Sequence, residues 1–188
     1  MKADDIHWLA HADQRLGLLP SVGGSVVAWQ WQHEGRTVDL WRPWDGVTAN
    51  PSAMACYPLV PWSNRITGGG FEHEGRFHAL APNTDADPYP LHGDGWLQPW
   101  TLTAEGAGCA AMSLHSHRHA GNPHTYRATQ RFELLPDGMA QTLTVTNLGP
   151  ASLPFGLGLH PWFHRTPGCV LRTRVDGVWL SRPDKIPS

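Results

Sequence analysis

The sequence is poor in cysteine and lysine. Its three cysteines, Cys56, Cys109 and Cys169, are widely spaced and form no CxxC pair. This spacing argues against a disulfide framework or a zinc ribbon and fits a reducing cytoplasm. Lys2 and Lys185 are the only lysines, so almost all of the positive charge is carried by arginine. The guanidinium group suits fixed, forked hydrogen bonding better than a mobile ammonium group does.

The sequence also lacks the features of membrane, secreted and nucleic-acid-binding proteins. No stretch approaches the roughly 18 apolar residues of a membrane span, and residues 1–18 have no apolar signal-peptide core. The net charge is −2 with neutral histidines, so no overall field attracts nucleic acid or anionic lipid. No basic strip with interleaved aromatic residues is present. We therefore expect a cytoplasmic protein with no nucleic-acid or membrane partner.

The composition is that of a globular domain. Hydrophobic residues make up 40% of the sequence and charged residues 16%, which is typical of folded chains. A length of 188 residues is enough to bury a sizeable core within one domain. No linker or low-complexity tract interrupts the sequence. We expect residues 1–188 to form a single domain.

Short strand patterns separated by turns fill most of the sequence. The 20 glycines and 17 prolines disfavour long helices, and no window shows sustained helical periodicity. QTLTVTN alternates between polar and apolar residues, which predicts one buried and one wet face. The pattern predicts strands at 25–32, 37–41, 128–135, 139–147, 169–174 and 178–180, with HEGR turns at 33–36 and 73–76. We therefore expect an all-β sandwich or barrel.

Three short segments contain the residues best suited to chemistry: PWSNRI at 61–66, LHGDGW at 91–96 and GLGLHPWF at 156–163. In the first segment, Arg65 has five donors in a rigid fork and suits adjacent hydroxyls or an oxygen that gains charge. Asn64 offers both a donor and an acceptor, the combination that a sugar hydroxyl needs. The alternative interpretation is an arginine that ties down loop carbonyls.

The other two segments each contain a histidine. His92 precedes a Gly-Asp-Gly turn whose glycines would let a substrate approach the backbone, and Asp94 could orient the imidazole or cap the turn. His160 ends a strand with alternating glycines, and Pro161 then forces an extended exit. The aromatic residues that follow, of which Trp162 is the first, would bring the pKa of His160 near neutrality, where it can donate a proton. For both histidines a purely structural role stays open.

A rival cluster consists of His115, His117 and His119, with His124 nearby. Alternate residues of a strand share a face, so three imidazoles could meet one metal ion. No carboxylate or cysteine joins them, and the Gly-Asn-Pro run that follows is typical of an exposed turn. We therefore expect no metal site. The sequence also has no phosphate-binding glycine loop.

Taken together, these segments resemble those of the aldose 1-epimerases, the galactose mutarotase-like proteins, and in particular their bacterial epimerase-like branch. The resemblance covers nearly the whole chain, from the Gly-Gly-Ser sequence at 23–25 to Phe163. It implies an antiparallel β-sandwich of the galactose mutarotase-like type and an isomerase that acts on a small-molecule sugar without a cofactor. At the position of Trp162 the family more often has tyrosine.

The resemblance also implies roles for individual residues. His160 is the general acid, His92 contacts the sugar near the reacting centre, and Asn64 and Arg65 bind sugar hydroxyls, with Trp162 as a further contact. The acid protonates the ring oxygen while a carboxylate base removes the proton of the anomeric hydroxyl. The ring then opens, the terminal carbon rotates, and reversed transfers reclose the ring on either face. Each proton transfer is typically worth about 10² to 10⁴ in rate.

The carboxylate base of the family is a glutamate far downstream of the His-Pro segment. After His160 this sequence has only Asp176 and Asp184 as carboxylates, and neither lies in a matching motif. We therefore expect a C-terminally truncated sandwich with impaired catalysis, whose exposed sheet edges a second copy would cover. Two alternatives stay open: a non-catalytic carbohydrate-binding module on the same fold, and a hexose-6-phosphate epimerase-like protein.

Overall fold

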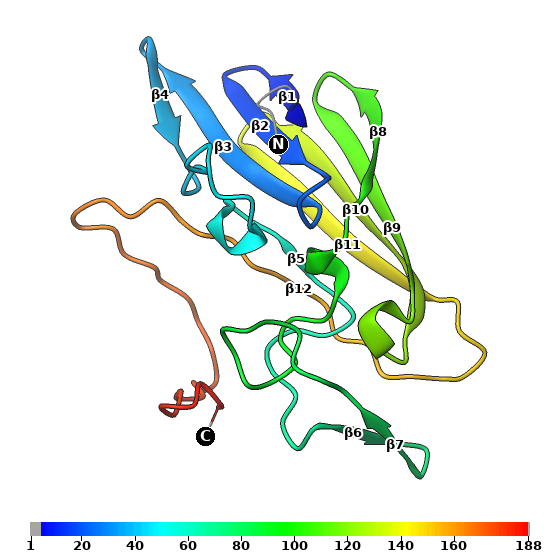
Figure 1. Ribbon diagram of the computed structural model, residues 1–188. Coiled ribbons are helices and arrows are strands. Elements are labelled where there is room, and N and C mark those ends of the chain that lie inside the picture. Colours follow the sequence, from blue (N-terminus) through cyan, green and yellow to red (C-terminus); the bar gives the residue numbers. More distant parts are fainter. Residues whose placement is uncertain (1–4, 188) are drawn as a thin grey trace.

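Two four-stranded antiparallel sheets form the body of the protein (Figure 1). The structure is a computed structural model that describes residues 5–187. The first sheet follows the chain order β1 (His7–His11), β2 (Gln14–Leu19), β3 (Ser25–His33) and β4 (Arg36–Asp39). The order in the second sheet is β11 (Gly138–Asn147), β10 (Thr125–Leu135), β9 (Cys109–His117) and β8 (Thr101–Gly106). The expected all-β architecture is confirmed.

The two sheets pack face to face through residues that alternate along each strand. In β10 every second residue from Tyr126 to Leu134 is buried, and the residues between them are exposed or half-buried. Leu16 and Leu18 of β2 join Phe132 of β10 in one buried cluster. Because each large apolar side chain stabilises the fold by about 1.5–3 kcal/mol when fully buried, this layer is the main source of stability.

Two glutamines fix the sheets relative to each other. Nε2 of Gln14 donates a hydrogen bond to the carbonyl of Leu135 at 2.6 Å, and Nε2 of Gln130 donates to the carbonyl of Gly24 at 2.8 Å. Both glutamines are buried. An unpaired buried amide costs about 1–3 kcal/mol, so these bonds disfavour any sliding of one sheet over the other.

Shorter elements cluster at one end of the sandwich (Figure 1). β5 (Pro58–Leu59) pairs with β12 (Gly158–Leu159), and β6 (Gly70–His73) pairs with β7 (Arg76–Ala79). The connections contain the short 3-10 helices η2 (Pro51–Ala53), η3 (Gly95–Leu97) and η4 (His119–Gly121). No helix in residues 5–187 has the length and hydropathy needed to span a membrane.

The hairpins that the sequence predicts are confirmed. β3 and β4 join through the first HEGR turn, where His33 pairs with Arg36, and β6 and β7 join through the second, where His73 pairs with Arg76. β10 and β11 form the long hairpin that was expected around the Pro-Asp-Gly turn. The alternation of QTLTVTN is present in β11, although its apolar side is only half-buried.

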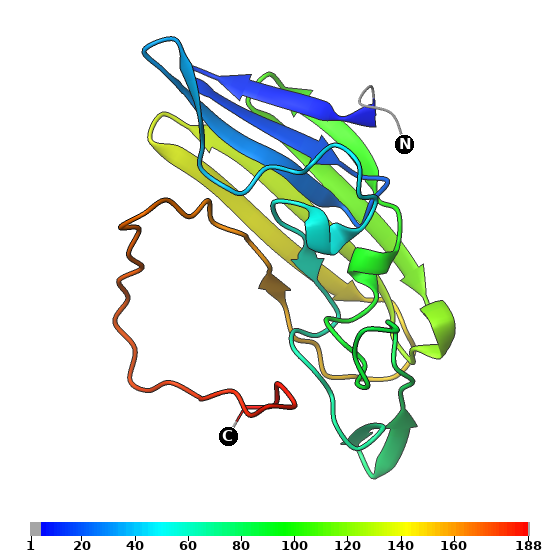
Figure 2. The ribbon, with the colours of Figure 1, turned by 60° about the vertical axis from the view of Figure 1, so that its left-hand side comes forward.

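The strands predicted at 169–174 and 178–180 are wrong. Residues 164–180 form no strand and are exposed, with Leu171 at 83% and Trp179 at 80% exposure. Figures 1 and 2 show this part of the chain, in orange and red, running apart from both sheets. Its β-branched and apolar residues favour extended backbone. A strand also needs a neighbour for its N–H and C=O groups, and no strand of residues 5–187 lies beside it.

Candidate functional site

The histidine-bearing segments both pack against the chain around β5. On one side, the N–H of His160 donates to the carbonyl of Tyr57 at 3.0 Å, and β12 pairs with β5. On the other side, Val60 forms a parallel bridge with Gly93. The imidazole rings of His92 and His160 consequently lie 5.4 Å apart, at an angle of 74°. Two segments that are distant in the sequence thus place their histidines side by side.

Asn64 and His92 hold each other through a reciprocal pair of hydrogen bonds. The N–H of His92 donates to the carbonyl of Asn64 at 2.9 Å, and the N–H of Asn64 donates to Nδ1 of His92 at 3.0 Å. Because Nδ1 accepts, the proton of the neutral imidazole lies on Nε2, which leaves an N–H donor for a ligand. Among the contacts of residues 5–187, Nδ2 of Asn64 has no hydrogen-bond partner and is a second available donor.

The backbone that carries His92 is clamped in place. The side chain of Asn83 donates to the carbonyls of Leu91 and Gly93 and accepts from the N–H of Leu91. Nε1 of Trp96 points to the same two carbonyls at 3.2 and 3.0 Å. His92 has a φ of 60°, which histidine seldom adopts. Such a conformation persists only where the surroundings over-determine it, as these contacts do.

Gly93 is where this clamp is tightest. Its φ is +69°, and an added Cβ would lie 2.1 Å from the carbonyl oxygen of Val60. We expect Gly93→Ala to lower the free energy of unfolding by about 2–4 kcal/mol, because left-handed strain and overpacking add. Gly35→Ala is the matched control: its φ is +73° with nothing within 4 Å, so about 1 kcal/mol is expected. Equal losses in urea denaturation would contradict the tight packing of the loop.

His160 lies within a stack of aromatic rings. Its imidazole is 4.7 Å from the ring of Tyr57 and nearly parallel to it, at 11°, and 5.1 Å from the ring of Trp162. Tyr57 also stacks on Trp96 at 5.5 Å, and the guanidinium of Arg42 lies 4.3 Å from the Trp162 ring centre. The stack fixes the plane of the imidazole. Trp162 remains 38% exposed, so part of its ring is open to a ligand.

Arg65 is bound to a carboxylate that the sequence analysis did not single out. Its Nε and Nη2 donate to Oδ2 of Asp87 at 2.8 and 2.6 Å, and its Nη1 donates to Oδ1 of Asn64 at 3.3 Å. The two side chains are 14% and 4% exposed. The hydrogen bonds from Arg65 hold the pKa of Asp87 below its usual range. Arg65 therefore anchors a carboxylate, and not the loop carbonyls of the alternative interpretation.

Burial keeps both histidines of the pair mainly neutral. It lowers the pKa of His92 to about 4, and the charges of His160 and Arg65 add to the effect. Burial is also the main cause that lowers the pKa of His160. At neutral pH, His92 is therefore a neutral hydrogen-bond donor, and the imidazolium form of His160 gives up its proton more readily than that of an ordinary histidine. The sequence predicted a pKa near neutrality for His160, and the structure instead lowers this pKa from its usual value.

The depressed pKa of His92 predicts that the protein loses stability in mild acid. His92 titrates at about 4 when folded and at its usual 6.5 when unfolded, so between these values the unfolded chain binds the extra proton. This contribution is therefore complete above pH 6.5 and is lost as the pH falls to 4. The shift is worth at most about 3 kcal/mol in a fully buried group, and partial exposure reduces the expected loss to about 1–2 kcal/mol.

His92→Asn tests this prediction, because asparagine tolerates a positive φ and keeps an acceptor near the Nδ1 position. Between pH 6.5 and pH 4 we expect the free energy of unfolding to fall by about 1–2 kcal/mol less in the variant than in the unaltered protein. Removal of the exposed His115 of β9, as His115→Asn, is the control. An unchanged pH dependence in His92→Asn would contradict the burial of a neutral imidazole at this position.

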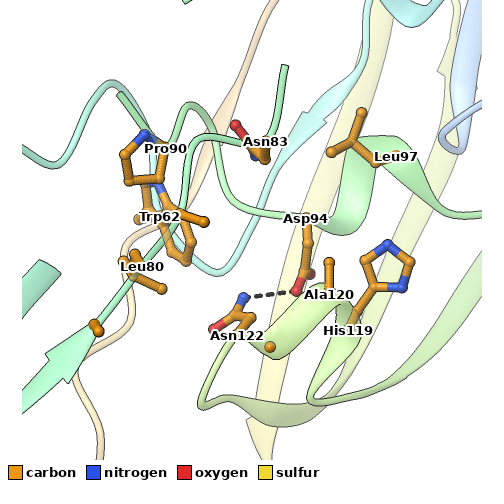
Figure 3. Close-up of a pocket in the computed structure, with 12 residues that line it drawn as sticks. Trp62, Leu80, Asn83, Pro90, Asp94, Leu97, His119, Ala120 and Asn122 are labelled. Atoms are coloured by element: carbon orange, nitrogen blue, oxygen red, sulfur yellow. Dashed lines mark hydrogen bonds between the residues drawn. The ribbon is translucent and has the colours of Figure 1, made fainter. Parts of the chain in front are cut away.

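Asp94 has neither of the roles that the sequence suggested. Nδ1 of His92 is bonded by Asn64, and the Asp94 side chain makes no capping hydrogen bond to η3. Its carboxylate is 4% exposed and points inward to Asn122 (Figure 3). Gly93 likewise packs against backbone, instead of leaving room for a substrate. The Gly-Asp-Gly turn therefore packs against the protein interior.

The rival histidine cluster does not converge. His115 and His117 are exposed on β9, whereas His119 lies on η4 and His124 is buried at 1% exposure. Within residues 5–187 no group of three or more histidine, cysteine, aspartate or glutamate residues is placed to hold a metal ion. The structure gives the metal alternative no support.

Three residues that shape the site were missed by sequence reasoning: Tyr57, Asn83 and Asp87. Tyr57 is typical of an apolar strand, and the other two belong to a polar loop. Arg65 and Asp87 are 22 residues apart, so no local pattern indicates the pair. The one available signal was an acid flanked by proline and polar turn residues, which is common in loops of every kind.

The site combines hydrogen-bond donors with a flat apolar wall. Nε2 of His92, Nδ2 of Asn64 and the remaining N–H groups of Arg65 are the donors. Trp162 supplies an aromatic surface beside His160. This combination suits a small ligand that carries hydroxyl groups on a ring with apolar faces.

Sequence comparisons relate this chain to one family and to two bacterial proteins. The family model described as aldose 1-epimerase matches residues 9–188. The uncharacterized protein YphB of Escherichia coli K12 is 36% identical over 179 residues, which cover 94% of this chain and 58% of YphB. The uncharacterized protein YihR of the same organism is 24% identical over 105 residues, which cover 55% of this chain and 34% of YihR. The chain thus spans less than two thirds of the length of these relatives.

Solved structures share the fold. A putative aldose 1-epimerase from E. coli K12 superimposes with a TM-score of 0.87 and 31% identity, over 97% of this chain and 60% of that one. A galactose mutarotase-like protein from Clostridium acetobutylicum gives a TM-score of 0.76 at 19% identity, over 96% of this chain and 59% of that one. The second likeness concerns the fold alone. Both agree with an antiparallel sandwich of the galactose mutarotase-like type.

Proposed function

This chain belongs to the aldose 1-epimerase family, and from that premise we propose that its histidine pair interconverts the α and β anomers of a free aldose. The observation that carries the proposal is the meeting of His92 and His160, with rings 5.4 Å apart, beside the donors of Asn64 and Arg65. Ring opening needs a proton donor at the ring oxygen and fixed donors that hold the hydroxyls in place.

In the proposed reaction each residue has a distinct task. His160 donates a proton to the ring oxygen as the bond to the anomeric carbon breaks, and takes it back on reclosure. His92, held neutral by burial, donates from Nε2 to an oxygen near the reacting carbon. Asn64 and Arg65 bind hydroxyls, and Trp162 packs against a face of the ring. The oxygen that gains charge is stabilised by donors that are already oriented before the reaction.

The second proton transfer, from the anomeric hydroxyl, needs a base. Among residues 5–187 no carboxylate forms a hydrogen bond with His92 or His160, and Asp87, which acts electrostatically on His92, is held by Arg65. Asp94 is buried beneath the loop. We therefore propose that these 188 residues bind the sugar but turn it over slowly, because a missing general base costs about 10² to 10⁴ in rate.

Polarimetry of freshly dissolved α-glucose and α-galactose tests the proposal. We expect a weak acceleration of mutarotation that grows linearly with polypeptide concentration. Rapid turnover would contradict the proposed lack of a base. Saturable sugar binding with no acceleration at all would favour the alternative of a carbohydrate-binding module. Among residues 5–187 no carboxylate is hydrogen-bonded to His92 or His160, which supports that alternative. A hexose-6-phosphate substrate has no such support, since Arg65 is bound to Asp87 and Arg42 to two carbonyls.

A further inference from the structure

A buried polar cluster beneath the histidine site has no part in the proposed reaction. It contains Asp94, Asn122, His124, Tyr126 and Gln98, all of which are less than 10% exposed. Figure 3 shows Asp94 and Asn122 facing each other across a hydrogen bond. Both residues line a cavity of about 280 Å³. Buried polar groups that are fully paired in this way specify one arrangement of the segments that carry them.

Asp94 is surrounded by donors. The hydroxyl of Tyr126 and Nε2 of Gln98 both donate to Oδ1, and Nδ2 of Asn122 donates to Oδ2 at 2.6 Å. The pKa of Asp94 is raised on balance, because burial outweighs the hydrogen bonds from Tyr126 and Asn122, which lower it. Three donors converging on two oxygens match an ionised carboxylate, which accepts only. A negative charge held here needs a positive partner, because an isolated buried charge is costly.

The orientation of the Asn122 amide identifies that partner. Its Nδ2 donates to Asp94, so its Oδ1 faces His124, and the backbone N–H of His124 donates to this same oxygen at 3.1 Å. Nδ1 of His124 lies 2.7 Å from Oδ1 of Asn122, and Nε2 lies 3.0 Å from the carbonyl of Pro154. Both ring nitrogens therefore face acceptors. A neutral imidazole has one N–H, and the imidazolium has the two that this geometry requires.

The surroundings of the His124 ring also suit a cation. The rings of Phe155, Phe71 and Trp62 lie 4.9, 5.9 and 6.0 Å from it, the first T-shaped and the other two tilted, and aromatic rings at such distances can attract positive charge. Burial lowers the pKa of His124, and the Pro154 carbonyl raises it. The net shift is downward, so the charged form needs a nearby anion to repay its loss of hydration.

We propose that Asp94 and His124 form a buried ion pair bridged by the side-chain amide of Asn122. The bridge joins two segments of the histidine site. Asp94 follows His92 by two residues, and His124 binds the carbonyl of Pro154, where the segment leading to His160 begins. Asp94 and His124 are thus positioning residues that fix both histidines relative to β10. This positioning role rests on the proposed function, whereas the charge state of the pair does not.

Within residues 5–187 the other titratable groups that act on the pair are few. His119 acts on Asp94, and His78 acts on His124, both through space. Tyr126 contacts Asp94 directly, and burial with the neighbouring Asp94 raises its pKa far above the usual value, so it stays a neutral donor. His78 opposes the charge on His124. Asp94 is the one carboxylate among these groups, which makes it the partner to remove in a test.

The test is the ring ¹⁵N spectrum of His124 in the 188-residue polypeptide. We expect both ring nitrogens to show imidazolium shifts and to carry slowly exchanging protons at pH 7.5, about one unit above the usual histidine pKa. In Asp94→Asn the ring is expected to become neutral, with a single N–H on Nε2. Asp137→Asn, in the exposed turn between β10 and β11, should leave the spectrum unchanged. A neutral His124 in the unaltered protein at pH 7.5 would overturn the proposal, whatever the folding of the variants.

A double variant separates the ion pair from simple packing. Asp94→Asn and His124→Gln should each lower the urea midpoint. The first removes the anion that keeps the His124 ring charged between two acceptors, and the second leaves the buried Asp94 charge without a partner. Together they should recover most of the loss, because the double variant is neutral. Exchange of the backbone N–H groups of His92 and His160 with solvent should accelerate in both single variants and slow again in the double variant. Additive losses in the double variant, or unchanged exchange in the single variants, would overturn the positioning role.

Discussion

His160→Gln is expected to lower the polypeptide-dependent rate of anomer interconversion by about 10² to 10⁴, because that is the usual worth of a general acid. Glutamine is similar in size and keeps an N–H donor, but it cannot deliver a proton to the ring oxygen. The stack of Tyr57 and Trp162 around position 160 should retain the sugar site. The rate is measured by polarimetry at several polypeptide concentrations, so that the slope is separated from spontaneous mutarotation.

His164→Gln is the matched control for this variant. His164 lies four residues further along the same segment and is exposed. Its replacement should leave the slope unchanged. Equal slopes for the unaltered protein and His160→Gln would show that His160 does not act as the acid, and the structural role that the sequence left open would then apply.

Asp87→Asn is expected to lower the free energy of unfolding by about 2–4 kcal/mol, because it leaves the guanidinium of Arg65 in a largely buried place without its counter-charge. The same pair should weaken in acid. The pKa of Asp87 is lowered in the folded state. The contribution of the ion pair to the free energy of unfolding is therefore present above the usual carboxyl pKa of 3.8 and is lost as the pH falls through the folded value. Urea denaturation at pH 7 measures the loss.

Asp184→Asn is the comparison for Asp87→Asn. Asp184 pairs with Arg182 at 2.7 Å, close to the 2.6 Å between Arg65 and Asp87. The side chains of Asp184 and Arg182, however, are both about half exposed. Exposed pairs contribute about 0–1 kcal/mol. A similar small loss in both variants would mean that the Arg65 pair is solvated and does not hold the site together.

The sequence predicted the sandwich well because its strands are mostly joined by local turns. The HEGR turns and the Pro-Asp-Gly turn each connect two strands directly, so strand pattern and turn chemistry point to the same pairing. The residues at 169–180 have similar β propensity but were predicted wrongly. Their backbone has no neighbouring strand in residues 5–187, and local propensity carries no information about a partner.

The site was only partly predictable from the residues themselves. Proton-handling and hydroxyl-binding side chains can be recognised by type, but the meeting of His92 with His160 depends on packing around β5. The resemblance to a known family was the reason to expect it. Asp94 was misjudged because a turn carboxylate is usually a local cap, whereas its partners Tyr126 and Asn122 lie on distant segments.

The most direct test of the sugar site is a titration of the isotope-labelled protein with galactose or glucose, followed through the histidine ring signals. We expect the signals of His92 and His160 to shift together and to saturate at one sugar concentration, while that of His164 stays in place. The shifts should be lost in Arg65→Met, which cannot bind hydroxyls. Saturable shifts elsewhere in the protein, with those two rings unmoved, would contradict the assignment of the histidine pair as the sugar site.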